Sequence, residues 1–226
     1  MAIKPGGTYA RRALHFIWLL DCSGSMRENG KIQSLNTAIR EALPAMRERA
    51  EGNPEVQLLI RAIKFAHGAD WHVPEPTPVS EFAWKDLTAD GETDMGQAFS
   101  LVAEELRGFP DTVRQFPPVL VLVSDGRPTD NWRRPLEDLL RLPWGERAVR
   151  MAIAIGHDAD IGVLQQFIGL PASERPPLRA DNPEALAERI KFVSTIAAGT
   201  SAGKQMPPVP SEMEGRAETG STSAIW

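Results

Sequence analysis

The sequence feature that most constrains the fold is a pair of almost wholly apolar runs, each of which stops at an aspartate. Val119-Leu-Val-Leu-Val123 is followed by Ser124-Asp125, and Ala13–Leu20 is followed by Asp21. Near-continuous apolar character over a short length is typical of strands that are buried on both faces, as in parallel sheets covered by helices. The two runs therefore predict buried strands of an α/β domain.

Helical patterns alternate with strand patterns along the rest of the chain. Apolar side chains recur every three or four residues over Ile32–Met46, and Pro44 is expected either to kink this helix or to mark its weak point. The proline- and aromatic-rich stretch Trp71–Leu87 is interpreted as a loop with one short edge strand near Phe82–Leu87. Further helices are expected from about Thr93 and at 135–142, 161–168 and 183–198, and further strands at 56–65, 149–155 and 178–179.

This alternation predicts an α/β fold with a doubly wound, mostly parallel sheet flanked by helices. The domain is expected to span residues 12–199, between an N-terminal extension at 1–11 and a flexible C-terminal tail at 200–226. The tail is rich in Gly, Ser, Thr, Pro and Glu and has no apolar periodicity before Ile225-Trp226. Trp226 is open to two interpretations: docking onto a protein surface, or an inert chain end.

Composition and charge exclude several classes of function. The net charge of −5 offers no basic surface for wrapping nucleic acid. No apolar run approaches the roughly 20 residues that span a bilayer. The single cysteine, Cys22, excludes an internal disulfide and a cysteine-based zinc site, and the four histidines show no ligand spacing. We therefore expect a cytoplasmic protein with no nucleic-acid or membrane partner.

Oxygen-bearing side chains are placed where the predicted strands end. Asp21 is followed by Ser23 and Ser25, Asp125 follows the later strand, and Thr93 stands near the start of a helix. Ligands of open α/β sheets bind beyond the carboxyl ends of the strands, so these segments are expected to converge there. All their donors are hard oxygens, which is ligand chemistry for Mg²⁺, with Mn²⁺ or Ca²⁺ as alternatives.

The three segments together resemble the metal-ion-dependent adhesion site (MIDAS) of von Willebrand factor A (vWA) domains. The matching segments are Asp-Cys-Ser-Gly-Ser at 21–25, Gly-x-Thr-Asp-x-Gly at 91–96 and Ser-Asp-Gly at 124–126. The resemblance implies a Rossmann-like vWA fold with an ion at these segments. Ser23, Ser25 and Thr93 would touch the ion, and Asp21 and Asp125 would bind it directly or through water.

One position departs from the family pattern. The family often has Gly-Gly-Thr where this chain has Gly91-Glu92-Thr93. Glu92 therefore adds a carboxylate beside the implied ion, which is expected to alter ion affinity while leaving Thr93 in place.

Within the family, the short layout resembles the bacterial tellurium-resistance proteins of the TerY type. The similarity lies in Asp-x-Ser-Gly-Ser-Met at 21–26, in Asn36, and in Ala152–Gly156 followed by Asp158-Ala-Asp160. This resemblance implies a stress-response module in which a kinase-like protein and a phosphatase are partners.

The residues favour binding over catalysis. No nucleophile–base pair can be read from the sequence, so we expect a non-enzymatic adaptor or scaffold. In this hypothesis, an Asp or Glu of a partner protein completes the coordination of the metal. Two alternatives stay open. One is a vWA subunit of an AAA+ ATPase complex of the chelatase type. The other is a Mg²⁺-dependent phosphohydrolase, although such enzymes normally need an acidic residue where Ser23 stands.

Overall fold

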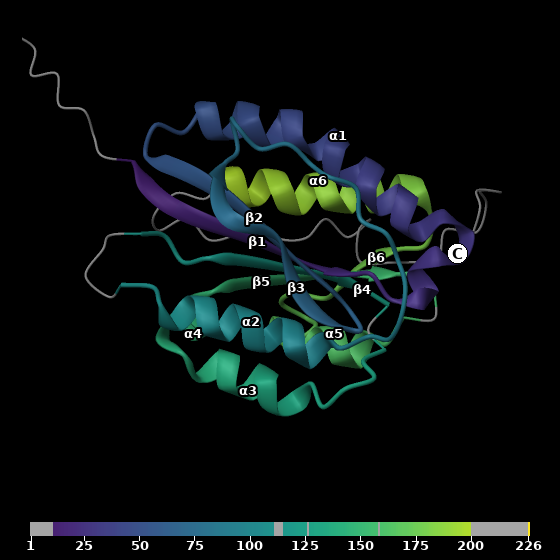
Figure 1. Ribbon diagram of the computed structural model, residues 1–226. Coiled ribbons are helices and arrows are strands. Elements are labelled where there is room, and N and C mark those ends of the chain that lie inside the picture. Colours follow the sequence, from purple (N-terminus) through teal and green to yellow (C-terminus); the bar gives the residue numbers. More distant parts are fainter. Residues whose placement is uncertain (1–10, 111–114, 126, 158, 200–225) are drawn as a thin grey trace, which may run out of the picture.

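A six-stranded sheet with helices on both faces forms the centre of the computed structural model, which describes residues 11–110, 115–125, 127–157, 159–199 and 226 (Figure 1). The strand order is β3-β2-β1-β4-β5-β6, and every neighbouring pair is parallel except β2 and β3. The strands are β1 (Arg12–Asp21), β2 (Val56–Ala66), β3 (Gly68–Pro78), β4 (Val119–Ser124), β5 (Val149–Ile155) and β6 (Leu178–Ala180). The predicted α/β fold with a doubly wound, mostly parallel sheet is confirmed.

The helices divide between the two faces of the sheet. α1 (Lys31–Glu51) and α6 (Pro183–Gly199) pack side by side on one face. The other face is covered by α2 (Met95–Arg107), α3 (Arg133–Arg141), α4 (Pro143–Arg147) and α5 (Ile161–Ile168). A short 3-10 helix, η1 (Gly24–Gly30), leads from β1 into α1, and α1 continues through Pro44 to Glu51. The sequence did not predict α4 as a separate helix.

The central strands feed two hydrophobic layers because their side chains alternate between the faces. In β1, Phe16 and Trp18 face α1 and α6, whereas Ile17 and Leu19 face α2. The Val119–Val123 run of β4 alternates in the same way, and each of its residues is at most 1% exposed. Burial on both faces explains why these strands lack polar alternation, as their sequences predicted.

The stretch Trp71–Leu87 differs from its predicted structure. Gly68–Pro78 forms a full edge strand, antiparallel to β2, whereas Phe82–Leu87 belongs to no strand. Proline lacks a backbone N–H, which an outward-facing position on an edge strand does not need, so the prolines of β3 are tolerated. Phe82 and Leu87 are buried, which shows that their apolar character serves packing against α1.

The predicted domain ends fall largely outside the described residues. This holds for 1–10 of the N-terminal extension and for 200–225 of the tail. Trp226 is described, and it docks on the domain. Its backbone N–H donates to the Asp181 carbonyl (3.2 Å), its indole N–H donates to the Asn29 carbonyl (3.2 Å), and its side chain joins the hydrophobic layer of α1 and α6. Within the described part of the chain, no helix is long and apolar enough to cross a membrane.

Candidate metal-binding site

The predicted ligands gather at the carboxyl edge of the sheet, between β1 and β4. The two strands pair in parallel with Leu20 beside Val123, so Asp21 and Ser124 come next to each other in register. From this edge the chain leaves β1 toward α1 on one face and β4 toward α3 on the other. The point where successive connections leave to opposite faces opens a crevice between the strand ends, which is where open α/β sheets bind ligands.

Four of the five predicted ligands form one chain of hydrogen bonds. Asp21 accepts the backbone N–H of Ser23 on Oδ1 (2.8 Å). The hydroxyls of Ser23 and Ser25 lie 3.0 Å apart. The Ser25 hydroxyl donates to Oδ2 of Asp125 (2.6 Å), which joins the β1 end to the β4 end. The sequence placed these four residues at a common edge, and the structure connects them there.

Thr93 is positioned by a different set of contacts. Its backbone N–H donates to the Thr129 hydroxyl (3.0 Å), and the backbone N–H of Thr129 donates to the Thr93 carbonyl (2.9 Å). The segment before Thr93 is also bound to the β1 end, because the Gly24 N–H donates to the Gly91 carbonyl (2.9 Å). Thr93 is 6% exposed. The third predicted segment is therefore held against both of the others by its backbone.

Two buried acids dominate the electrostatics of this site. Asp21 is fully buried, and Asp125 is 4% exposed. Burial raises the pKa of Asp21 to about 6, although hydrogen bonds from Ser124 and Ser23 oppose the shift. The negative charge of Asp125 raises this pKa further. A buried carboxylate beside a second one is costly unless a cation compensates both, so the donor set fits a divalent ion.

The remaining groups near Asp21 do not offer a reactive alternative. Cys22 is 3% exposed, and burial raises the pKa of its thiol to about 12. The thiolate is the nucleophilic form of cysteine, so this residue is held in its inert form at neutral pH. This agrees with a role for Cys22 as a small apolar residue.

Three further side chains, outside the predicted ligand set, support the site. The Ser124 hydroxyl donates to Oδ2 of Asp21 (2.6 Å), and Thr129 holds Thr93 as described above. Asp130 accepts the backbone N–H groups of Gly96 (3.0 Å) and Gln97 (3.1 Å), and so caps the start of α2. Ser124 belongs to the Ser-Asp-Gly motif, and the other two follow Asp125 in the same connection. Gly126 of that motif lies outside the described residues.

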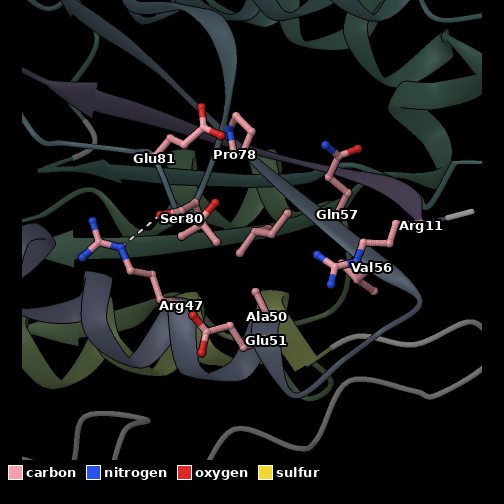
Figure 2. Close-up of a pocket in the computed structure, with 11 residues that line it drawn as sticks. Arg11, Arg47, Ala50, Glu51, Val56, Gln57, Pro78, Ser80 and Glu81 are labelled. Carbon is pink, nitrogen blue, oxygen red and sulfur yellow. Dashed lines mark hydrogen bonds between the residues drawn. The ribbon is translucent and has the colours of Figure 1, made fainter.

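A separate surface hollow lies at the opposite end of the sheet. This cavity of about 210 Å³ is bordered by the end of α1, the start of β2 and the end of β3 (Figure 2). Arg47, on its wall, donates to the carbonyls of Val79 and Phe82. The arginine is thus occupied with holding the segment after β3, and the hollow does not join the predicted ligands.

Comparison with known proteins gives matches in structure alone. No family model matches the sequence, and no curated protein matches it. A von Willebrand factor type A protein from Catenulispora acidiphila superposes with a TM-score of 0.63 at 16% identity, over 83% of this chain and 43% of that one. The ArnB paralog VWA2 from Sulfolobus acidocaldarius gives 0.56 at 17% identity, over 80% of this chain and 45% of that one.

A third structure contains a metal. The proximal thread matrix protein 1 of the mussel byssus, with a zinc-occupied MIDAS motif, superposes with a TM-score of 0.59 at 17% identity, over 84% of this chain and 48% of that one. This chain therefore spans less than half the length of each of these three neighbours. At these identities the matches show the fold, which is that of vWA domains.

Proposed function

We propose that this chain is a metal-dependent protein-binding domain. Asp21, Ser23, Ser25, Thr93 and Asp125 would hold one Mg²⁺, and a carboxylate from a partner protein would complete its coordination. The observation that carries this proposal is the hydrogen-bonded chain from Asp21 through Ser23 and Ser25 to Asp125, with both acids buried at the carboxyl edge of the sheet. The vWA fold and the zinc-occupied MIDAS of the mussel protein support it.

The charge of the donor set explains why a partner acid would bind. Two carboxylates neutralise a divalent ion, but the hydroxyls of Ser23, Ser25 and Thr93 add no negative charge. Hydrogen bonds also partly compensate the negative charge of each carboxylate. Asp21 accepts two hydrogen bonds, and Asp125 accepts one from Ser25. An ion held by this set would stay electrophilic and could accept an incoming carboxylate.

The surroundings of the site favour binding over turnover. Among the described residues, no histidine is hydrogen-bonded to a hydroxyl of the cluster. The Ser25 and Ser124 hydroxyls donate instead to Asp125 and Asp21, the two carboxylates that would hold the ion. The raised pKa of Cys22 removes the thiol as a nucleophile. A nucleophilic mechanism needs an activated group within hydrogen-bond reach of a free base, and in this proposal both carboxylates would be committed to the ion.

The finer part of the proposal concerns the partners. The sequence resemblance to TerY-type proteins supports a kinase-like protein and a phosphatase, in a tellurium-resistance-like stress response. Asn36 is one of the residues on which that resemblance rests. It is buried, and its side chain is hydrogen-bonded to the segment that leads to Thr93. If the retained partner were an AAA+ ATPase, the chain would instead be assigned as a subunit of that ATPase complex.

The test is retention of partners from host lysate by the immobilised chain, with Mg²⁺ and with EDTA. Asp125→Asn and Ser25→Ala are the site variants, and Asp138→Asn, at a partly exposed position on α3, is the matched control. We expect one protein to be retained by wild type and the control with Mg²⁺, and to be lost in EDTA and in both site variants. Mass spectrometry then separates a kinase or phosphatase from an ATPase.

Thermal unfolding of each variant in EDTA checks that the fold is intact. Retention of the same partner in every arm would show that the metal site is not the interface.

A further inference from the structure

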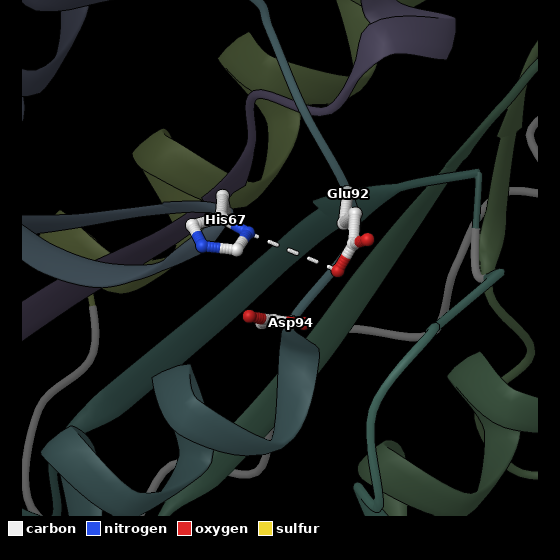
Figure 3. Close-up of side chains that lie close together, drawn as sticks. All are labelled: His67, Glu92 and Asp94. Atoms are coloured by element: carbon white, nitrogen blue, oxygen red, sulfur yellow. Dashed lines mark ion pairs between the residues drawn. The ribbon is translucent and has the colours of Figure 1, made fainter.

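A second group of metal-ligating side chains lies beside the first site. His67 stands in the turn between β2 and β3, and Glu92 and Asp94 stand just before α2 (Figure 3). One ligand atom from each of the three lies within 4.8 Å of the other two. The sequence showed no ligand spacing for the histidines because His67 meets its acidic neighbours only through the tertiary fold. None of the three belongs to the predicted Mg²⁺ set.

The backbone of this region holds the two segments together. Gly91 has a φ of +88°, and a Cβ there would lie 3.3 Å from both the backbone N and the Cβ of His67. Only glycine adopts this conformation readily and leaves room for so close an approach. The Asp94 N–H also donates to the Ala66 carbonyl (2.9 Å). The turn that carries His67 is therefore built against the segment that carries both acids.

Asp94 is oriented by hydrogen bonds to one of its oxygens. Oδ2 accepts the backbone N–H of Gly68 (2.7 Å) and the side-chain amide of Gln97 (3.1 Å). Oδ1 receives only a long contact of 3.5 Å from the Thr129 hydroxyl. The residue is 8% exposed. A carboxylate whose second oxygen is hydrogen-bonded to the protein is a common arrangement of metal ligands, because the hydrogen bonds set its orientation.

The other two ligands are accessible to solvent. The side chains of His67 and Glu92 are 85% and 64% exposed, and Nδ1 of His67 lies 3.8 Å from Oε2 of Glu92. That separation is too long for a hydrogen bond. Ligand atoms bound to one tetrahedral Zn²⁺ lie about 3.4 Å apart. Small rotations of these two exposed side chains would bring all three ligand atoms to such distances and leave a fourth position for water.

We propose that His67, Glu92 and Asp94 form a second metal site, which binds Zn²⁺ or a similar borderline transition ion. One imidazole nitrogen with two carboxylate oxygens is a ligand set for zinc, whereas Mg²⁺ and Ca²⁺ are bound by oxygen alone. The site differs in chemistry from the oxygen-only set of Asp21 and Asp125. It uses Glu92, the residue at which this chain departs from the Gly-Gly-Thr pattern of vWA domains.

The test is a zinc titration of the whole chain in saturating Mg²⁺, which would occupy the proposed first site. We expect wild type to bind one equivalent of Zn²⁺ by calorimetry. His67→Gln and Glu92→Gln should each weaken that binding at least tenfold, since each removes a ligand. His72→Gln, on the neighbouring strand β3, is the matched histidine control and should bind as wild type does. Ser25→Ala, in the first site, should leave the zinc affinity unchanged.

Two results would overturn the proposal. One is equal zinc affinity in wild type and His67→Gln. The other is zinc binding that Ser25→Ala removes and His67→Gln does not, which would place the ion in the first site. Co²⁺ substitution gives a second readout, because the visible absorption of a site with a histidine ligand should be lost in His67→Gln. Thermal unfolding in EDTA, expected to match wild type for the exposed positions His67 and Glu92, shows that each variant is folded.

Discussion

Single hydroxyl and carboxylate groups set the properties of the candidate metal-binding edge. Asp21 accepts one hydrogen bond from its own loop, through Ser23, and one from the neighbouring strand, through Ser124. These bonds hold its carboxylate in place against the cost of full burial. A raised pKa of about 6 shows that burial still dominates. At the residue scale, neutral hydrogen-bond donors thus preorganise the site, and a cation would stabilise its two buried carboxylates.

His15 gives the first prediction at this scale. Its ring centroid lies 4.5 Å from that of Phe109, and its Nδ1 is buried without a hydrogen-bond partner among the described residues. Burial lowers the pKa of His15 from 6.5, so the unfolded chain binds this proton more readily than the folded one. The stabilising contribution of neutral His15 is therefore complete above pH 6.5 and is lost as the pH falls below it.

The measurement is the free energy of unfolding in urea between pH 5 and pH 8, for wild type and His15→Leu in EDTA. The stability of wild type should fall relative to that of the variant as the pH drops below about 6.5. Parallel pH profiles for the two proteins would contradict this assignment.

At the scale of elements, one helix residue holds the long connection that carries Thr93. Asn36 of α1 donates to the Leu87 carbonyl (2.9 Å) and accepts from the Leu87 N–H (2.8 Å) and the Trp84 indole (3.0 Å). The Asn36 amide thus satisfies both backbone groups of Leu87, which has no strand partner because it belongs to no strand. The start of α2 depends in a similar way on Asp130, which reaches Gly96 from the β4–α3 connection.

Asn36→Leu should destabilise the fold by about 2–4 kcal/mol, because it leaves the buried backbone groups of Leu87 without partners. It should also weaken metal binding at the first site, since the connection it holds leads to Thr93. Chemical unfolding measures the first effect and Mn²⁺ titration the second.

Thr37→Ala, one position along on an exposed face of α1, is the control and should change stability by less than about 0.5 kcal/mol. If Asn36→Leu proved as stable as this control, the connection would have to be held by other contacts.

At the scale of the whole molecule, Trp226 packs into the hydrophobic layer of α1 and α6. Trp226 is 6% exposed and contacts η1 through Asn29 and the β6–α6 connection through Asp181. Its carbonyl also lies 2.6 Å from Nδ1 of His157, after β5. Of the two interpretations of Trp226, docking onto the domain is the one that the structure supports.

Trp226→Ala should lower the free energy of unfolding by about 2 kcal/mol, from the loss of a large buried apolar side chain. Trp226→Phe should recover part of this loss, because it restores apolar burial without the hydrogen bond to Asn29. Urea unfolding of the two variants measures both effects. Equal stability of wild type and Trp226→Ala would mean that this contact contributes nothing to the fold in solution.

The sequence predicted secondary structure correctly where the apolar pattern of one short segment was enough to identify a strand or a helix. The apolar run Val119–Val123 predicted a strand buried on both faces. The 3.6-residue period of Ile32–Met46 predicted a helix with one buried face. Strand β3 was missed because its prolines indicate a loop in an average context, whereas an edge strand leaves outward positions where no N–H is required. Phe82–Leu87 was misassigned for the converse reason: apolar residues can pack into a core without forming a strand.

The sequence by itself determined the layered α/β fold and the set of oxygen donors expected at the strand ends. It could do so because periodicity and the polar stop of a buried strand are properties of consecutive residues. Only the tertiary structure decided which groups touch. The hydrogen bond from Ser124 to Asp21, the meeting of His67 with Glu92 and the docking of Trp226 on Asn29 each join segments that are far apart in the chain. Such pairs form because the sheet brings the ends of distant strands to one edge. A pattern of consecutive residues does not predict which distant segments will meet.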